Sequence, residues 1–89
     1  MGLHKKFENN LNVISNEMKK IRIEKKISLS LLSDKLMLMG IDISKQSLYR
    51  IENNKRSVRD YELYGIAKVL NISTDELLAD FEKNKINYW

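Results

Sequence analysis

The 89-residue sequence contains no cysteine and no proline, and it has only three glycines. Without cysteine, the chain has no disulfide to stabilise a small fold and no thiolate ligand for a metal ion. Without proline, long stretches can form uninterrupted helix. Apolar runs are too short to span a bilayer, and the first residues contain no apolar signal-peptide region. These absences predict a cytoplasmic protein that is held together by its core.

The chain is long enough for one small domain and leaves no room for a separate sensing or catalytic domain. Its charge is unevenly distributed. Residues 1–28 and residues 44–59 each carry a net charge of +4, whereas residues 60–82 carry −5. Such a polarised chain is suited to docking on a polyanion in one orientation. The alternative is that these charges are simply solvated surface.

Apolar residues at helical spacing predict two helices in the first half of the chain. Ser28 is a suitable N-cap for the second helix, and Gly40 is a suitable residue to end it. The second helix is expected to turn Leu32, Leu36 and Met39 inward. The first helix is predicted from about Glu8 to Lys25, with an apolar stripe at Leu11, Ile14, Met18 and Ile21.

Three further helices are predicted in the second half. Ser44 caps a helix over residues 45–53, and a fourth helix runs from about residue 59 to 70. A capping box at residues 73–76 opens the fifth helix. Five short helices with short connections predict a compact all-α domain.

The expected domain organisation is a flexible N-terminal arm at residues 1–7, one domain at residues 8–82 and a tail at residues 83–89. The single histidine, His4, has no second histidine or cysteine to form a metal site with, so no metal and no cofactor are expected. Tyr88 and Trp89 end an otherwise polar tail, and we expect them to pack on the domain or on a dimer mate.

The most informative segment runs from Ser44 to Arg56. It predicts a short capped helix whose inward residues are Leu48 and Ile51, followed directly by a basic loop. Its outward residues are polar and rich in hydrogen-bonding groups. A helix of this kind is suited to a DNA major groove, where phosphate contacts hold it in place.

Two segments resemble the lambda repressor/Cro (XRE-type) helix-turn-helix family. They are Ile-Glu-Asn-Asn-Lys-Arg at residues 51–56 and Ile-Ala-Lys-Val-Leu-Asn-Ile-Ser at residues 66–73. The resemblance covers roughly Ile14 to Leu78. It implies a compact five-helix lambda-repressor-like DNA-binding domain, acting as a bacterial or phage transcriptional regulator. Such regulators usually bind double-stranded DNA at a palindromic operator as a homodimer.

The resemblance also implies roles for individual residues. Arg22 and Glu52 match positions where the family often has an ion pair between the first helix and the recognition helix. Ser47 and Arg56 have an alternative interpretation as solvated surface groups. The positions that match base-reading residues are Lys45, Gln46, Tyr49 and Arg50. The candidate phosphate-binding residues are Ser28, Ser47, Asn54, Lys55, Arg56 and Arg59.

The chain departs from the family pattern at three places. The link between Leu36 and Ser44 is about five residues longer than the usual turn, which predicts a longer second helix and a wider loop. The apolar residues of this link are either core residues or a partner surface. Leu29 stands where many relatives have a glutamine that contacts phosphate. Lys26 and Asn54 stand where glycine is common.

The sequence therefore predicts a DNA-binding transcriptional regulator, a repressor that dimerises through the fifth helix and the tail. No arrangement of catalytic residues is recognisable, so enzymatic activity is not expected. The alternative function is a protein-interaction module with the same fold, such as an antitoxin or an anti-regulator. The apolar link and the two terminal aromatic residues favour that alternative.

Overall fold

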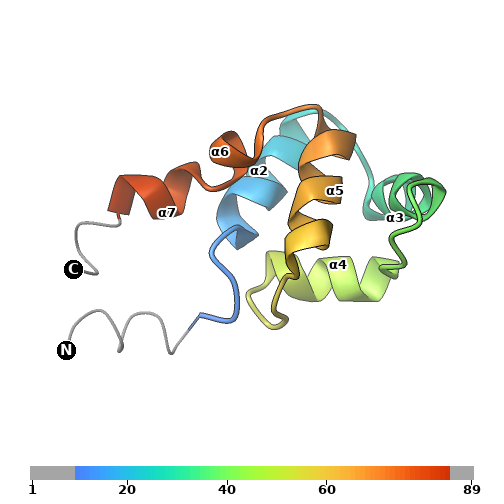
Figure 1. The fold of residues 1–89 in the computed structure, drawn as a ribbon, viewed down its shortest axis with the longest axis horizontal. Helices are drawn as coiled ribbons and strands as arrows, with labels where there is room; N and C mark the ends of the chain where they lie inside the picture. Colours follow the sequence, from blue (N-terminus) through green and yellow to red (C-terminus); the bar gives the residue numbers. More distant parts are fainter. Residues whose placement is uncertain (1–9, 85–89) are drawn as a thin grey trace.

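The structure is a computed structural model that describes residues 10–84 of the chain. Within this range it contains helices and no strand (Figure 1), so the all-α fold class expected from the sequence is confirmed. The helices are α2 (Ser15–Glu24), α3 (Leu29–Leu38), α4 (Lys45–Glu52), α5 (Asp60–Leu70), α6 (Thr74–Leu77) and α7 (Ala79–Asn84).

One apolar core lies between these helices. α3 packs against both α4 and α5, and α2 packs against α4 and α6 (Figure 1). The core therefore supports α4 from several sides. Its fully buried large side chains come from α2 to α6 and from the link before α4, and they are Met18, Leu32, Leu36, Ile43, Leu48, Ile51, Ile66, Leu70 and Leu77.

The helix that was predicted from about Glu8 corresponds to α2 within the described residues, and α2 begins only at Ser15. Oδ1 of Asn12 accepts hydrogen bonds from the backbone N–H groups of Ile14 (3.0 Å) and Ser15 (2.9 Å), which closes a turn directly before α2. Leu11, expected in the apolar stripe, therefore lies outside the helix and is 54% exposed. The prediction was wrong because apolar spacing does not reveal an asparagine that competes for the backbone. Glu8 lies outside the described residues.

The predicted fifth helix is divided into α6 and α7, which meet at Leu78. The expected capping box is present: Ser73 Oγ accepts from the N–H of Glu76 at 3.1 Å, and Oε1 of Glu76 accepts from the N–H of Ser73 at 3.2 Å. Leu77 is fully buried in the core, and Leu78 lines a separate apolar groove. Consecutive residues of a straight helix point about 100° apart, so we attribute the break to the different contacts of the two leucines, Leu77 in the core and the half-buried Leu78 in the groove.

The long link between α3 and α4 is packed against the core. Gly40 has a φ of +80°, and the N–H of Ile41 donates to the carbonyl of Leu36 at 2.9 Å. Ile41 and Ile43 are buried. The hydroxyl of Ser33 donates to the carbonyl of Ile43 at 2.6 Å, which connects α3 to the residue before the cap of α4. The link therefore has a defined shape although it is long.

The other apolar residues of this region face solvent. Met37 is 52% exposed, Leu38 87% and Met39 41%. Met39 was expected to point inward from the second helix, but it is the C-cap residue of α3, where the chain leaves the helix axis. The two interpretations of the apolar link therefore apply to different parts of it, because Ile41 and Ile43 belong to the core and residues 37–39 form an exposed surface.

Two non-glycine residues that stand where relatives have glycine adopt left-handed backbone conformations. Lys26 and Asn54 both have a φ of 58°. At the end of α2, the N–H of Lys26 donates to the carbonyl of Ile23 at 3.0 Å, and the N–H of Ile27 donates to that of Arg22 at 3.1 Å. The turn thus keeps a hydrogen-bonded helix ending even with a lysine, at a cost in backbone strain.

We expect Lys26→Gly to raise the free energy of unfolding by about 0.5–1 kcal/mol. The left-handed conformation costs an L-residue about 1–2 kcal/mol, and the larger backbone entropy of glycine offsets about half of this gain. Lys25→Gly is the matched control, because Lys25 has a φ of −87° and gains nothing from glycine. Urea unfolding measures the free energy of unfolding of both variants. A Lys26→Gly protein that is no more stable than Lys25→Gly would show that the backbone of Lys26 is not strained.

Candidate nucleic-acid interface

α4 begins at a serine cap and has two chemically distinct faces. Ser44 Oγ accepts from the N–H of Ser47 at 3.1 Å. The inner face inserts Leu48 and Ile51 into the core, where both are fully buried. Residues at i, i+1, i+4 and i+5 lie on one side of a helix. The four predicted base-reading residues have this spacing and are all exposed, and we call the surface that they form the reading face: Lys45, Gln46, Tyr49 and Arg50.

An ion pair joins the inner side of α4 to α2. Nε of Arg22 lies 2.6 Å from Oε2 of Glu52, and Nη2 of Arg22 lies 3.0 Å from Oε1. Nη1 of Arg22 also donates to the carbonyl of Ile27 at 2.9 Å, in the turn before α3. The Glu52 side chain is only 2% exposed. A single arginine therefore connects α2, α4 and the start of α3, and its partner is the one that the sequence suggested.

The loop after α4 contains three of the cations that were expected to bind phosphate. Lys55 and Arg59 are exposed. Nη1 of Arg59 lies 3.3 Å from the hydroxyl of Tyr61. Arg56 is half-buried, and its Nη1 and Nη2 donate to Oε1 and Oε2 of Glu62 at 2.9 and 3.0 Å. The guanidinium of Arg56 is thus bound within the protein, and Lys55 and Arg59 are the cations that the loop presents to solvent.

The buried carboxylate of Glu62 keeps its charge because of this pairing. Burial works to raise the pKa of Glu62, but hydrogen bonds from Arg56 and from the N–H of Arg59 (2.9 Å), together with both positive charges, outweigh it and hold the pKa below its ordinary value of 4.5. The pKa of Arg56 is raised, mainly by its hydrogen bond to Glu62. The sequence did not indicate this pair, because nothing in the spacing of the two residues distinguishes it from a solvated one.

Two asparagines hold the segment before α2 against the end of α4. Oδ1 of Asn54 accepts from the N–H groups of Leu11 (2.8 Å) and Asn12 (3.1 Å). Nδ2 of Asn12 donates to the carbonyls of Ile51 (2.9 Å) and Arg56 (3.0 Å). The role of Asn12 was not anticipated, since its partners lie about forty residues away along the chain. These bonds help to determine the shape of the loop that carries Lys55.

The remaining candidate phosphate ligands also have partners within the protein. Ser28 Oγ caps α3 by accepting from the N–H of Leu31 at 3.0 Å, and Ser47 Oγ accepts from the Ser44 hydroxyl at 3.1 Å. A hydroxyl that accepts in this way still has its own proton to donate. Ser28 is exposed and Ser47 half-buried, so both hydroxyls are compatible with a contact to a phosphate oxygen.

An apolar hollow of about 260 Å³ lies within the reading face. Its lining combines Leu29, the first residue of α3, with Lys45, Gln46, Tyr49 and Arg50 of α4. The lining is almost entirely apolar. The methylene groups of the long polar side chains and the Tyr49 ring therefore form its walls together with Leu29. The family resemblance placed Leu29 where many members have glutamine, but it did not show that Leu29 joins the α4 side chains.

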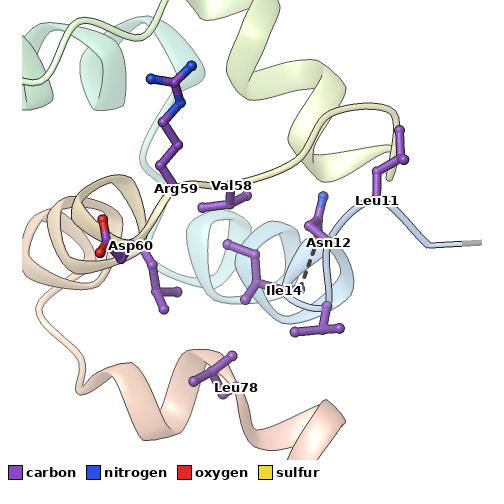
Figure 2. Close-up of a pocket in the computed structure, with 9 residues that line it drawn as sticks. Leu11, Asn12, Ile14, Val58, Arg59, Asp60 and Leu78 are labelled. Carbon is purple, nitrogen blue, oxygen red and sulfur yellow. Dashed lines mark hydrogen bonds between the residues drawn. The ribbon is translucent and has the colours of Figure 1, made fainter. Parts of the chain in front are cut away.

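A second apolar groove, of about 220 Å³, lies beside the start of α5 (Figure 2). Ile14, Val58 and Leu78 converge on it from three segments that are distant in the sequence, while the side chain of Arg59 extends away from it (Figure 2). Leu11, which is 54% exposed, lies at its edge. This groove adjoins the junction of α6 and α7.

Among residues 10–84, no three His, Cys, Asp or Glu side chains are grouped so that they could hold a metal ion. No helix in the same range is long and apolar enough to cross a membrane. The predictions for the N-terminal arm with His4, and for Tyr88 and Trp89, concern residues outside the described range, which excludes 1–9 and 85–89.

Glu62→Gln should lower the free energy of unfolding at neutral pH by about 1–3 kcal/mol, because the variant leaves Arg56 without a charged partner. The pKa of Glu62 is depressed in the folded protein, so its contribution is fully present above the unfolded pKa and is lost as the pH falls through the lower folded pKa. The wild type should therefore lose more stability than Glu62→Gln between about pH 5 and about pH 3.

Urea unfolding across this pH range makes the comparison. Asp34→Asn is the matched control, because Asp34 is exposed on α3, and it should follow the wild type. If wild type and Glu62→Gln showed the same pH dependence, the buried ion pair would not have the role assigned to it.

Comparison with known proteins agrees with this geometry. A family model described as helix-turn-helix matches residues 18–77, which is more than half of the chain. No significant match was found among curated proteins or among solved structures. The matched range contains α3, the link and α4, which are the two helices and the turn of the motif, together with α5, α6 and the greater part of α2. The chain therefore belongs to the lambda repressor-type (XRE) helix-turn-helix family of DNA-binding regulators.

Proposed function

We propose that the protein is a sequence-specific transcriptional repressor that places α4 in the DNA major groove. The observation that carries this proposal is the reading face itself, whose four polar side chains are exposed on a helix that the core and the Arg22–Glu52 pair hold from behind. Gln46 is suited to bidentate pairing with adenine, and Arg50 or Lys45 to pairing with guanine. The proposed function involves no catalysis.

We propose that phosphate contacts come from Lys55, Arg59 and the hydroxyls of Ser28 and Ser47. The two cations are exposed, and the hydroxyls lie at the N-termini of α3 and α4, where the helix dipole favours an anion. We assign Arg56 and Asn54 to shaping the loop, since the Arg56 guanidinium is held by Glu62 and Oδ1 of Asn54 binds backbone N–H groups. A phosphate contact by Arg56 would require its ion pair to open.

We propose that the protein acts as a homodimer on a palindromic operator and represses by occluding promoter DNA. A twofold dimer presents two recognition helices about 34–36 Å apart, one turn of DNA. The apolar groove beside the α6–α7 junction is our candidate for the dimer contact, since Ile14, Val58 and Leu78 offer apolar area there (Figure 2). The acidic residues of 60–82 would be unfavourable near phosphate and so suit a side remote from DNA.

One observation favours the alternative of a protein-interaction module. Met37, Leu38 and Met39 form an exposed apolar surface at the end of α3, and Leu38 is 87% exposed. Binding to mixed genomic DNA distinguishes the two functions, because a DNA-binding protein shows an affinity that falls steeply with salt. A chain that does not bind DNA even at low salt would favour the protein-interaction module.

The division between reading and holding predicts different effects of two substitutions. Arg50→Ala should cost about 1–3 kcal/mol on the preferred operator and little on random duplex, because it removes a base contact. Lys55→Ala should weaken binding to both duplexes alike and reduce the salt slope by about one unit, because it removes a phosphate contact. Fluorescence anisotropy titrations at several salt concentrations measure both effects.

The matched control is Lys68→Ala, which removes an exposed lysine of α5 that lies over the ring of Tyr64. It should leave both affinities and the salt slope unchanged. Equal losses on operator and random duplex for Arg50→Ala and Lys55→Ala would contradict the assignment of the two roles.

A further inference from the structure

The apolar hollow in the reading face is unusual for a surface that meets a polyanion. Leu29 contributes an aliphatic side chain at the first turn of α3, directly beside the exposed polar residues of α4. It is half-buried and packs against the core, so its position is well defined. The side chain of a leucine cannot donate a hydrogen bond to phosphate. Together with the Tyr49 ring, it therefore offers an apolar surface to the partner.

We propose that this hollow receives the 5-methyl group of a thymine, so that Leu29 and Tyr49 give the protein a preference for thymine at one base pair. The inference rests on the proposed insertion of α4 into the major groove and assigns one specificity-determining contact there. Of the four standard bases, only thymine presents a methyl group on the major-groove edge. A methyl group buried between the two side chains is stabilised because it is removed from water.

The charges around the hollow favour DNA as the source of this methyl group. Lys45 and Arg50 contribute to the lining, and their positive charges suit a partner of negative potential such as the DNA groove. An apolar protein segment would have to desolvate these charges without compensation. The volume of about 260 Å³ leaves ample room for a methyl group and the edge of its base.

The neighbouring amide makes the contact more specific. Gln46 also lines the hollow, and a glutamine side chain pairs bidentately with the N6 and N7 groups of adenine. A hydrogen bond to adenine and an apolar contact to thymine together describe an A·T pair, or two adjacent ones. The hollow thus adds to the polar reading face a contact that distinguishes thymine from cytosine.

The test uses the full chain and the preferred duplex selected from a random pool. Each thymine of that duplex is replaced singly by deoxyuridine, which removes only the methyl group. At one position in each half-site, the substitution should weaken binding of the protein about fourfold. This ratio corresponds to about 0.8 kcal/mol for one buried carbon group. Substitution at every other thymine should change the affinity much less.

Variants assign the effect to Leu29. Leu29→Ala should bind the thymine and uracil duplexes equally well, with an unchanged salt slope, because no charge is removed. Leu31→Ala is the matched control: Leu31 is a 42% exposed leucine of the same helix that does not line the hollow, and this variant should keep the fourfold ratio. Leu29→Met, which keeps an apolar side chain of similar size, should largely retain the ratio. Melting temperatures show that the variants are folded.

The outcomes separate this inference from the proposed function. If the pool yields a preferred duplex but uracil weakens binding at no position, the methyl contact is refuted and DNA reading by α4 stands. If a uracil effect persists at full size in a folded Leu29→Ala protein, the assignment to Leu29 is wrong. If the pool yields no preferred duplex, the proposed function fails and the inference fails with it. Should Leu29→Ala not fold, the uracil series on the wild type and Leu29→Met still decides.

Discussion

The ion pair between Arg22 and Glu52 is the contact on which the position of α4 depends. The Glu52 carboxylate, 2% exposed, would be costly to bury alone, and two hydrogen bonds from one guanidinium satisfy it. Replacing both residues by apolar ones need not lower the free energy of unfolding, since buried ion pairs often stabilise a protein no more than hydrophobic contacts do. The pair instead fixes the orientation of α4 relative to α2, because a planar, bidentate contact allows only one arrangement of the two side chains. The third hydrogen bond of Arg22, to the carbonyl of Ile27, also ties the segment before α3 to this pair.

The polar contacts around α4 divide into an inner set and an outer set. Glu52, Asn54 and Arg56 bind other parts of the chain and so determine where α4 ends and how the following loop runs. Lys45, Gln46 and Lys55 are exposed and available to a partner. The Arg56–Glu62 pair belongs to the inner set although the residue type suggested a phosphate ligand. The lengthened link supports the same arrangement from the other end, because Ile43 is buried and its carbonyl is bound by Ser33.

Much of this architecture could be predicted from local patterns. Apolar spacing located α3, α4 and α5, and serine caps marked the starts of α3 and α4. The family resemblance implied the ion pair of Arg22 with Glu52, which the structure contains. The start of α2, the break at Leu78 and the pairing of Arg56 could not be predicted in this way. The start of α2 depends on local hydrogen bonds of Asn12, which apolar spacing does not reveal. The other two depend on contacts across the fold, and neither helical periodicity nor composition contains information about such contacts. The apolar hollow is of the same kind, since Leu29 and Tyr49 are twenty residues apart in the printed sequence.

The outer face of α4 and the loop after it are the surface that we expect to bind DNA. Titration of isotope-labelled protein with its selected duplex, followed by NMR, tests this claim residue by residue. The largest chemical-shift changes should fall on the amides of residues 45–50 and 55–59, with a smaller group at the start of α3 and little change in α6. Changes that are concentrated on Met37, Leu38 and Met39, with the α4 amides unaffected, would contradict this expectation.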